Sequence, residues 1–561
     1  MSRQQDVRLA CCLMVTCGSL AITVPVVADN PMPCSDLQNL VFPQATVIST
    51  TVVPADAVSG RPVHCRVGAT ISPNPGSRIV VVYRLPIEER WNGRLLGIGG
   101  SGWAGDLTIG SATLGLSRGY ATLQTDAGHP GSNPLDLAWS LLAPGRLNEE
   151  AVVDFGHRAV HLMTAVGKEV ARAFYGRSHD FAYFQGCSTG GRQGFQEVQR
   201  YPTDYDGVVS GAPVYNIGVF LSSIWRTQIF HAEPGRNLLP AHVPLLANAV
   251  VAACDELGSL DRIADGIITN PLRCRFDPGA LQCIDPLDGG DPTCLSAKQV
   301  ETVRKMYGGH RTPEGEVIAE GITHGAEPDW TLRSVGVPAF PLGLYASLGA
   351  PFFSYMVKLD PTFSLFDVDV DADLGDAKAA FATREIEATS PNVMPFSRSG
   401  GKWIIWHGFN DPGPSPKQTA KYYEEVVEAL GRSLQDEGDD HDDHGDKLRA
   451  VGQHVRYFLA PGVFHCGGGP GPDVVNANLL TALEEWVEHG LTPERIIATK
   501  NNSPLARPLC PYPKLARYVG SGSTNDPASF VCVKAIDREP FRKDDDDHDD
   551  DDGRDDGGVP H

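Results

Sequence analysis

Short apolar runs recur along the chain, separated by longer stretches with helical periodicity. The runs are rich in β-branched and aromatic residues and mostly bounded by Gly or Pro, which predicts β-strands. They lie at 79–83, 94–98, 120–123, 181–184, 207–210, 403–406 and 455–459. Apolar residues spaced by three and four predict helices at 151–175, 416–431 and 475–489. Strands that alternate with helices in this way predict an α/β fold, with a mostly parallel sheet covered by helices on both faces.

This alternation stops between about 217 and 398. The stretch carries many Pro, Cys and aromatic residues and shows no regular exchange of strands and helices. Strand-like segments resume at Trp403, which argues against an independent C-terminal domain. We therefore expect a core domain made of 29–216 and 399–541, with a large lid domain, 217–398, inserted between two of its strands.

The first 28 residues have the pattern of a secretory signal peptide. Arg3 and Arg8 precede an apolar stretch that ends in Val26-Val27-Ala28, small residues that suit cleavage before Asp29. Ser and Thr dilute this stretch, Pro25 interrupts it, and no stop-transfer charges follow, which argues against a membrane anchor. We expect residues 1–28 to be removed and the mature protein to be secreted or periplasmic, with no membrane as a partner.

The formal net charge of −22 is concentrated in two segments. Residues 436–446 contain seven acids, and residues 544–556 contain ten Asp against one Arg. Such blocks repel themselves and stay solvated, so we expect an exposed loop at 436–446 and a disordered acidic tail at 542–561. Their interspersed His441, His444 and His548 are compatible with loose metal binding, although solvated segments are the simpler interpretation. No basic surface is indicated, so nucleic acid is not an expected partner.

A Gly-x-Ser-x-Gly motif follows one of the predicted strands. In Gly186-Cys-Ser188-Thr-Gly190 the glycines permit the sharp strand-to-helix turn that exposes a Ser hydroxyl. The residues after the motif can start a helix, whose N-terminal dipole favours a developing oxyanion. The motif alone arises often by chance in a chain with 60 Gly residues, but its context predicts that Ser188 is a nucleophile.

A serine nucleophile needs a base and an acid, expected in the chain order Ser, acid, His, each on a loop just after a strand. Asp411 follows one predicted strand, and His465 follows the next. His407 and His454 compete with His465 for the role of the base. Three matching contexts in the expected order favour Ser188, Asp411 and His465 as a catalytic triad.

The oxyanion of an acyl-transfer intermediate needs two backbone N–H donors. One is expected from Thr189, the residue after the nucleophile, and the other from an early Gly-rich loop, here 99–105. Neither a Rossmann nor a Walker phosphate-binding sequence is present in this loop.

Ten Cys residues follow the signal peptide, an even number that predicts disulfides in an exported chain. Their spacing suggests no zinc site, and counting alone does not give the pairing. Cys187 directly precedes the nucleophile, and Cys466 directly follows the base. If Ser188 and His465 are in hydrogen-bond contact, these two Cys residues are close enough for a disulfide.

A turn-rich segment of the lid crowds three carboxylates, at Asp255, Asp261 and Asp265. Oxygen ligands of this kind suit calcium, but the spacing is not that of an EF-hand. From composition alone, a solvated turn is favoured.

Taken together, these motifs resemble the tannase/feruloyl esterase family of α/β-hydrolases, which includes bacterial mono(2-hydroxyethyl) terephthalate hydrolases. The resemblance covers nearly all of the mature chain except the middle of the lid and the Asp-rich segments. It is carried by Trp91-Asn-Gly-Arg, Thr125-Asp-Ala-Gly-His129, Gly186-Cys-Ser-Thr-Gly-Gly-Arg-Gln-Gly194, Tyr205-Asp-Gly-Val-Val-Ser-Gly-Ala-Pro213, His407-Gly-x-x-Asp411, His465-Cys-x-Gly-Gly-Pro470 and Leu509-Cys-Pro-Tyr-Pro513.

The resemblance implies an α/β-hydrolase core and further site residues. It implies that Gly102 is the second oxyanion donor and that Cys187–Cys466 is the family's shared disulfide. It implies the remaining pairs Cys34–Cys65, Cys254–Cys274, Cys283–Cys294 and Cys510–Cys532. It also implies a structural calcium ion in the lid, bound by the carboxylates of Asp255, Asp261 and Asp265 and the carbonyls of Ile263 and Ile267. This chain differs from the family in having three extra residues between Asp255 and Asp261, and Arg262 where Gly is usual.

The resemblance implies a serine carboxylic-ester hydrolase that acts through an acyl-enzyme on small esters of aromatic acids, without an organic cofactor. Feruloyl-type esters rank slightly ahead of tannin-type esters. A terephthalate monoester hydrolase is an alternative, but no counterpart of the Arg that grips the free carboxylate is evident. A catalytically silent polyphenol- or carbohydrate-binding protein of the same fold is a second alternative, and a peptidase is a third. The lid offers aromatic residues for stacking, most of them expected in the core: Trp330, Phe340, Tyr345, Phe352, Phe353 and Tyr355. The oligomeric state is left open.

Overall fold

The computed structural model describes residues 30–255, 260–261, 263–284, 290–434, 444–473 and 476–537. The predicted signal peptide, the acidic tail from 542 and most of the predicted acidic loop lie outside the described residues. The end of that loop was placed wrongly, because α12 (His444–Val451) already begins at His444. The ring of His444 lies between Glu424 and Glu428 of a neighbouring helix, at 3.4 and 3.3 Å, so this residue belongs to a packed helix pair.

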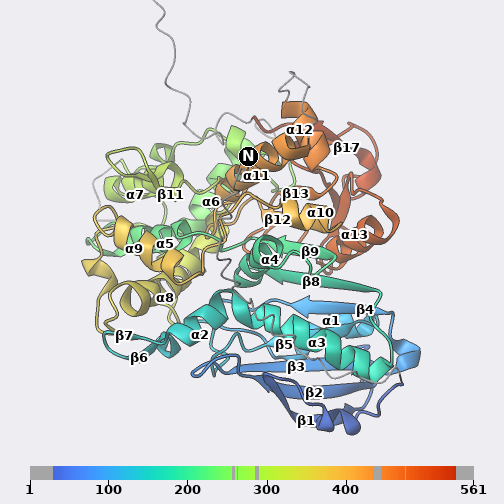
Figure 1. Ribbon diagram of the computed structural model, residues 1–561. Helices are drawn as coiled ribbons and strands as arrows, with labels where there is room; N and C mark the ends of the chain where they lie inside the picture. The colour runs from blue at the N-terminus through green and yellow to red at the C-terminus, as the bar shows by residue number, and fades with distance from the viewer. Residues whose placement is uncertain are drawn as a thin grey trace, which may run out of the picture.

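The core of the described chain is a nine-stranded sheet with the order β1-β2-β3-β5-β4-β8-β9-β12-β13. The six strands from β5 to β13 run parallel to one another, whereas β1, β2 and β3 are added in antiparallel fashion beside β5. Figure 1 shows this antiparallel part in blue at one end of the molecule. The strands are β1 (Ala45–Val53), β2 (His64–Ile71), β3 (Ile79–Pro86), β4 (Arg94–Ile98), β5 (Ala121–Thr125), β8 (Phe181–Cys187), β9 (Gly207–Gly211), β12 (Lys402–Gly408) and β13 (Val455–Ala460).

Side chains of a strand point alternately to the two sides of the sheet. In the parallel part the apolar side chains on both sides are covered by helices, so both faces are buried. Ile405 belongs to the apolar cluster on one face and Ile404 to the cluster on the other. On the first face the cluster includes side chains of α3, α4 and α11, and on the second face those of α13. The helices of the core are α1 (Ile109–Ser117), α2 (Glu149–Val153), α3 (Ala159–Tyr175), α4 (Thr189–Arg200), α11 (Pro416–Leu434) and α13 (Asn476–His489), with a π-helical turn at Asp154–Arg158 joining α2 to α3. The mostly parallel α/β fold predicted from the sequence is confirmed.

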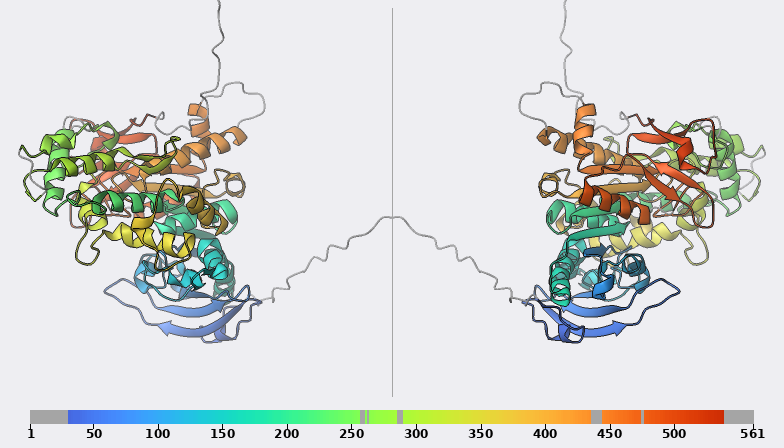
Figure 2. Two further views of the ribbon diagram at one scale, coloured as in Figure 1. Left: turned by 90° about the vertical axis from the view of Figure 1, so that its left-hand side faces the viewer. Right: turned by 90° about the vertical axis from the view of Figure 1, so that its right-hand side faces the viewer.

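The segment between β9 and β12 contains most of the remaining helices. It has one apolar cluster of its own and shares another with side chains that precede β9, such as Trp103 and Phe155. Figure 1 shows most of it in green and yellow on one side of the molecule, the side that faces the viewer in the left part of Figure 2, whereas its last helix, α10, lies near β12. Its elements are α5 (Gly218–His231), α6 (His242–Cys254), α7 (Ala297–Gly308), β10 (Gly309–Arg311), β11 (Val317–Glu320), α8 (Leu344–Pro351), α9 (Leu374–Thr383) and α10 (Met394–Arg398). We keep the name lid for residues 217–398; their division from the core as a domain stays a prediction.

Short hairpins complete the described structure. One, of β6 (Leu141–Ala143) and β7 (Arg146–Leu147), precedes α2. Two follow α13: β14 (Ile496–Thr499) with β15 (Ala506–Leu509), and β16 (Lys514–Tyr518) with β17 (Phe530–Lys534). Among the helices described, none is long and apolar enough to cross a membrane.

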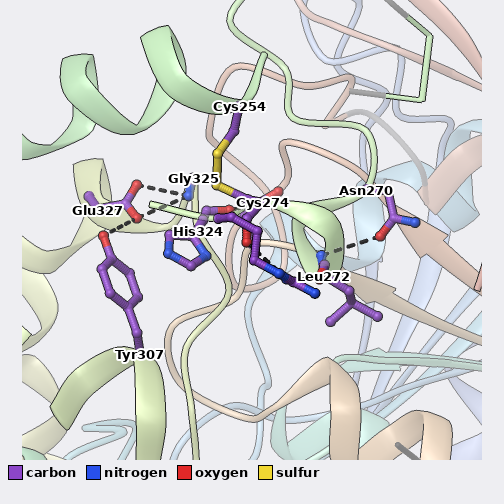
Figure 3. Close-up of a disulfide and its surroundings, with 10 residues drawn as sticks. Cys254, Asn270, Leu272, Cys274, Tyr307, His324, Gly325 and Glu327 are labelled. Atoms are coloured by element: carbon purple, nitrogen blue, oxygen red, sulfur yellow. Dashed lines mark hydrogen bonds between the residues drawn. A yellow bond between two sulfur atoms is a disulfide. The ribbon is translucent and has the colours of Figure 1, made fainter. Parts of the chain in front are cut away.

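The described residues form five disulfides, and they are the five pairs that the family resemblance implies: Cys34–Cys65, Cys187–Cys466, Cys254–Cys274, Cys283–Cys294 and Cys510–Cys532. Figure 3 shows Cys254–Cys274, which joins the end of α6 to the following segment of the lid. Its surroundings contain a carboxyl group with no exposed surface, that of Glu327.

Glu327 organises the lid segment that follows β11. Its carboxylate accepts hydrogen bonds from Tyr307 Oη at 2.8 Å and from the backbone N–H of Gly325 at 2.8 and 3.0 Å (Figure 3). Burial raises the pKa of Glu327 to about 7, although these hydrogen bonds act in the opposite direction. The carboxyl therefore gains its charge near neutral pH.

A raised carboxyl pKa makes stability fall as the pH rises. The native state keeps a proton that the unfolded chain has lost, so this contribution is complete below the usual pKa of 4.5 and is lost as the pH rises through about 7. The Glu327→Gln variant keeps the shape of the side chain but does not ionise. The difference in unfolding free energy, variant minus wild type, should therefore be ~1–3 kcal/mol larger at pH 8 than at pH 5. Urea unfolding at the two pH values measures this, and a constant difference would contradict it.

Candidate active site

Ser188 lies on a tight turn between β8 and α4, as its motif predicts. Its φ of +63° is a conformation that L-residues seldom adopt, and close backbone packing maintains it. A Cβ atom at residue 186 would lie 2.6 Å from the backbone of Gly190, so the strand side of the turn requires glycine. The Ser188 N–H donates to the carbonyl of Gly211 on the neighbouring strand, at 2.9 Å.

The three residues of the predicted triad are joined by hydrogen bonds. Ser188 Oγ and His465 Nε2 are 3.0 Å apart, and His465 Nδ1 and Asp411 Oδ2 are 2.7 Å apart. Because a carboxylate only accepts, Nδ1 carries the ring proton and Nε2 is free to accept the Ser188 hydroxyl proton. Asp411 follows β12 and His465 follows β13, and these adjacent parallel strands end at the same edge of the sheet.

Asp411 has no exposed side-chain surface, and three groups donate hydrogen bonds to its carboxylate. His465 Nδ1 and His407 Nε2 donate to Oδ2, at 2.7 and 3.1 Å, and the N–H of Gly413 donates to Oδ1 at 2.8 Å. Burial acts to raise the pKa of this carboxyl, but the two imidazoles outweigh burial and hold it well below its usual range. Asp411 is therefore a buried carboxylate anion.

His407 competed with His465 as the base, and the structure gives it a different place. Its Nε2 faces two acceptors, Asp411 Oδ2 and the Pro414 carbonyl, both at 3.1 Å. Nε2 must therefore carry the proton, and Nδ1 accepts from Thr419 Oγ1 at 3.0 Å. His407 thus orients the acid rather than the serine. His454 precedes β13, at the opposite end of that strand from the site.

The two N–H groups predicted to bind an oxyanion lie on the Gly-rich loop and at the start of α4. Thr189 Oγ1 donates to the Gly102 carbonyl at 2.6 Å, which ties the loop to the helix. Gly102 has a φ of +54°, and a Cβ atom there would lie 2.2 Å from the carbonyl oxygen of Pro134. Within the part of the chain that the structure describes, neither the Gly102 nor the Thr189 N–H donates to another protein group. The Gly100 N–H, by contrast, donates to Gln193 Oε1 at 2.9 Å.

A narrow cavity opens onto Ser188 and His465. Its walls are mainly apolar, formed by Trp103, Phe155, Val214, Val219, Phe220, Leu348 and Ile386. Tyr345 also lines it, whereas Trp330, Phe352 and Phe353 are wholly buried in the core. Sequence reasoning missed the main aromatic walls. The position of Trp103 directly after Gly102 was a usable signal, but no local pattern brings Phe155 or Phe220 to the same cavity.

The three Asp residues among the predicted calcium ligands interact electrostatically, and two of them are engaged with protein groups. Asp261 accepts from Thr269 Oγ1 at 2.5 Å, and Asp265 pairs with Arg507 at 2.6 Å. Asp255 Oδ1 is buried without a hydrogen-bond partner among the described residues. Burial, with repulsion from the other two carboxylates, raises the pKa of Asp255 to about 6. No group of three His, Cys, Asp or Glu side chains in the described ranges is arranged to hold a metal, and the calcium site stays a prediction.

The sheet, with a nucleophile turn after β8 and polar loops after β12 and β13, defines an α/β-hydrolase. A family model described as tannase and feruloyl esterase matches residues 65–533. The protein belongs to the tannase and feruloyl esterase family and is a carboxylic ester hydrolase.

Known members of the family match almost the whole chain. An uncharacterised esterase of Xanthomonas campestris is 32% identical over 97% of this chain and 98% of its own. A mono(2-hydroxyethyl) terephthalate hydrolase of Piscinibacter sakaiensis is 31% identical over 88% of this chain and 90% of its own. The crystal structure of feruloyl esterase B from Aspergillus oryzae superimposes with a TM-score of 0.76 at 27% identity, covering 88% of this chain and 98% of that one.

The Cys187–Cys466 disulfide joins the two loops that carry Ser188 and His465, across 279 residues of sequence. We expect the Cys187→Ala/Cys466→Ala variant to lose kcat even at temperatures where it remains folded, because a displacement near 1 Å can cost roughly a hundredfold in rate. The matched control removes Cys510–Cys532, a disulfide of the C-terminal hairpins, and should lower stability by ~2–4 kcal/mol with little change in kcat. Equal kcat values in the two double variants, or a free thiol at Cys187, would refute the idea.

Proposed function

We propose that this protein is a serine esterase that cleaves esters of aromatic acids, with Ser188 as the nucleophile. The observation that carries the proposal is the line of hydrogen bonds from Asp411 through His465 to Ser188, which opens onto a cavity with aromatic walls. A protein that only bound such compounds would have no need of this aligned and buried acid.

The geometry supports a two-step mechanism through an acyl-enzyme. His465 Nε2 takes the proton as Ser188 Oγ attacks the ester carbonyl, and Asp411 stabilises the imidazolium that forms. The N–H groups of Gly102 and Thr189, which have no other acceptor among the described residues, would stabilise the oxyanion. His465 then protonates the departing alcohol, and water, activated by the same imidazole, releases the acid.

An aromatic acyl group suits the cavity. Trp103 and Phe220 are stacked with their ring centroids 4.8 Å apart, and Phe155 lies 5.7 Å from Trp103. Planar aromatic groups pack well against such walls. Relatives named feruloyl esterase B support a hydroxycinnamic acid as the first candidate, ahead of gallic acid.

A terephthalate monoester is less favoured, because its free carboxylate would need a cation. The cavity is lined by Arg192, but its guanidinium already donates to the carbonyls of Gly156 and Phe155, at 2.6 and 3.0 Å. It also makes a long hydrogen bond to the Ile386 carbonyl, at 3.4 Å, and lies over the ring of Phe155, 4.7 Å from its centroid. Arg192 thus serves to join α4 to the neighbouring backbone.

We propose that the lid sets the acid specificity, since Val219, Phe220, Tyr345 and Leu348 all come from its helices α5 and α8.

We also propose that the protein is exported with the signal peptide 1–28. Five disulfides support this, because such bonds form and persist in oxidising compartments.

We further propose a structural calcium ion held by Asp255, Asp261 and Asp265, with the carbonyls of Ile263 and Ile267. The support is the buried, unpartnered Oδ1 of Asp255 beside two further carboxylates. A bound cation would offset the mutual repulsion of these groups.

A substrate panel tests the proposed function. Methyl ferulate, methyl gallate and a terephthalate monoester should be hydrolysed with the highest kcat/KM for the ferulate.

Ser188→Ala should abolish this hydrolysis and leave folding intact, given typical triad losses of ~10⁴ to 10⁶. Retention of more than about a hundredth of the wild-type kcat would rule out Ser188 as the nucleophile. Casein cleavage with no ester turnover would favour a peptidase, and binding without turnover a silent binding protein.

Chelation tests the calcium site. Saturating calcium should stabilise the fold by about 2.7 kcal/mol at a hundredfold excess over Kd, so EDTA should lower Tm with a smaller effect on kcat. Asp261→Asn should remove the calcium dependence of Tm. An unchanged Tm after chelation, with no calcium found by elemental analysis, would contradict the assignment.

A further inference from the structure

Arg226 is a buried cation of the lid that reaches the loop of the catalytic acid. It lies on α5, is only 3% exposed, and points its guanidinium at the Asp-Pro-Gly-Pro loop after β12. Nη1 donates to the carbonyls of Pro412 and Gly413, at 2.6 and 3.2 Å, and Nη2 donates to the carbonyl of Glu320 at 2.9 Å. Arg226 thus joins three backbone segments through one side chain.

One of these contacts leads directly to Asp411. The Pro412 carbonyl and the Gly413 N–H belong to the same peptide group, so they point in opposite directions. Arg226 binds the carbonyl end of this group, and the N–H end donates to Asp411 Oδ1 at 2.8 Å. A single peptide dipole therefore connects a buried guanidinium to a buried carboxylate.

In the part of the chain that the structure describes, the charge of Arg226 has no direct counter-ion. Within the described ranges no carboxylate lies in ion-pair distance of its guanidinium, although a buried charge normally requires a partner. A hydrogen bond to the carbonyl polarises a peptide group and strengthens the donation from its N–H. The cation and the anion thus stabilise each other across the peptide.

We propose that Arg226 is a positioning residue of the triad, which holds the Pro412–Gly413 peptide so that its N–H fixes and stabilises the carboxylate of Asp411. The role rests on the proposed function, in which Asp411 orients and stabilises the base. Tyr345 adds a steric limit on the same loop, because a Cβ atom at residue 413 would lie 2.3 Å from its hydroxyl oxygen.

Other charged and titratable groups also face this part of the site. Asp329 and Arg333 form an ion pair at 2.9 Å on the lid, and both act electrostatically on Asp411. His407 and His465 donate to its other oxygen. Arg226 differs from the two imidazoles in acting on Oδ1 through the backbone, so its removal leaves their hydrogen bonds to Oδ2 in place.

Loss of Arg226 should therefore change the chemistry and not only the fold. In Arg226→Met we expect kcat for p-nitrophenyl acetate to fall by about ten- to a hundredfold, because the acid and base are no longer held to within a fraction of an ångström. KM should change by less than about threefold, since Arg226 does not line the substrate cavity. The acid limb of kcat/KM should move to higher pH, because the loss of a nearby cation favours protonation of the triad.

Two further variants separate this role from simple destabilisation. Arg226→Lys keeps the charge but has one donor group in place of a fork, so it should retain the wild-type acid limb with a smaller loss of kcat. Lys417→Met is the matched control: Lys417 Nζ donates to the Gly321 carbonyl at 2.8 Å and so also joins lid and core, without touching the Pro412–Gly413 peptide. It should lower Tm and leave kcat within about twofold.

Each outcome decides the matter. Unchanged kcat in folded Arg226→Met would overturn the role of Arg226 and leave the proposed function standing. The same follows if Lys417→Met loses as much kcat as Arg226→Met and the acid limb of Arg226→Met does not move. If Arg226→Met does not fold, folded Arg226→Lys decides, and full wild-type kcat in that variant overturns the proposal. No turnover by the wild type above the Ser188→Ala background would overturn the proposed function as well.

Discussion

The buried negative charge of Asp411 is the constraint on which the arrangement of the active site depends. A carboxylate that is taken out of water must be compensated by donors at both oxygens, and removal of one partner of a buried charge costs ~3–5 kcal/mol. Here those donors come from three directions: the β13 loop with His465, the end of β12 with His407, and the Gly413 peptide of the acid's own loop. The loops cannot move independently without leaving part of this charge unpaired.

The sheet makes this convergence possible. Because β8, β9, β12 and β13 are parallel and adjacent, their carboxyl ends meet at one edge, and the polar loops that follow them face one another. Cys187–Cys466 then fixes the serine loop to the histidine loop, and Arg226 fixes the acid loop to the lid. Covalent and electrostatic links thus hold different pairs of loops, so neither can replace the other.

Most of the core and the triad could be predicted from the sequence, because their signals are local. Strands such as 403–406 are unbroken apolar runs, and each triad residue follows such a run within a few positions. Strand β1 was not predicted, because it is an edge strand whose exposed positions, such as Val52, blur any apolar pattern. The end of the acidic loop was wrong for another reason: the charged start of α12 packs against α11 through His444, a contact that composition does not encode.

Helix α5 shows why the remaining site residues escape sequence analysis and why they matter together. Val219 and Phe220 line the cavity beside Ser188, and Arg226, two turns further along, holds the acid loop. In the sequence, Arg226 looks like any charged residue in a helix, and only the fold reveals that its donors end on the backbone beside Asp411. Because one rigid helix carries both functions, a substitution that shifts α5 to enlarge the cavity also shifts the guanidinium. Changes of acid specificity should therefore be tolerated more readily at Leu348 on α8 than at positions that set the axis of α5.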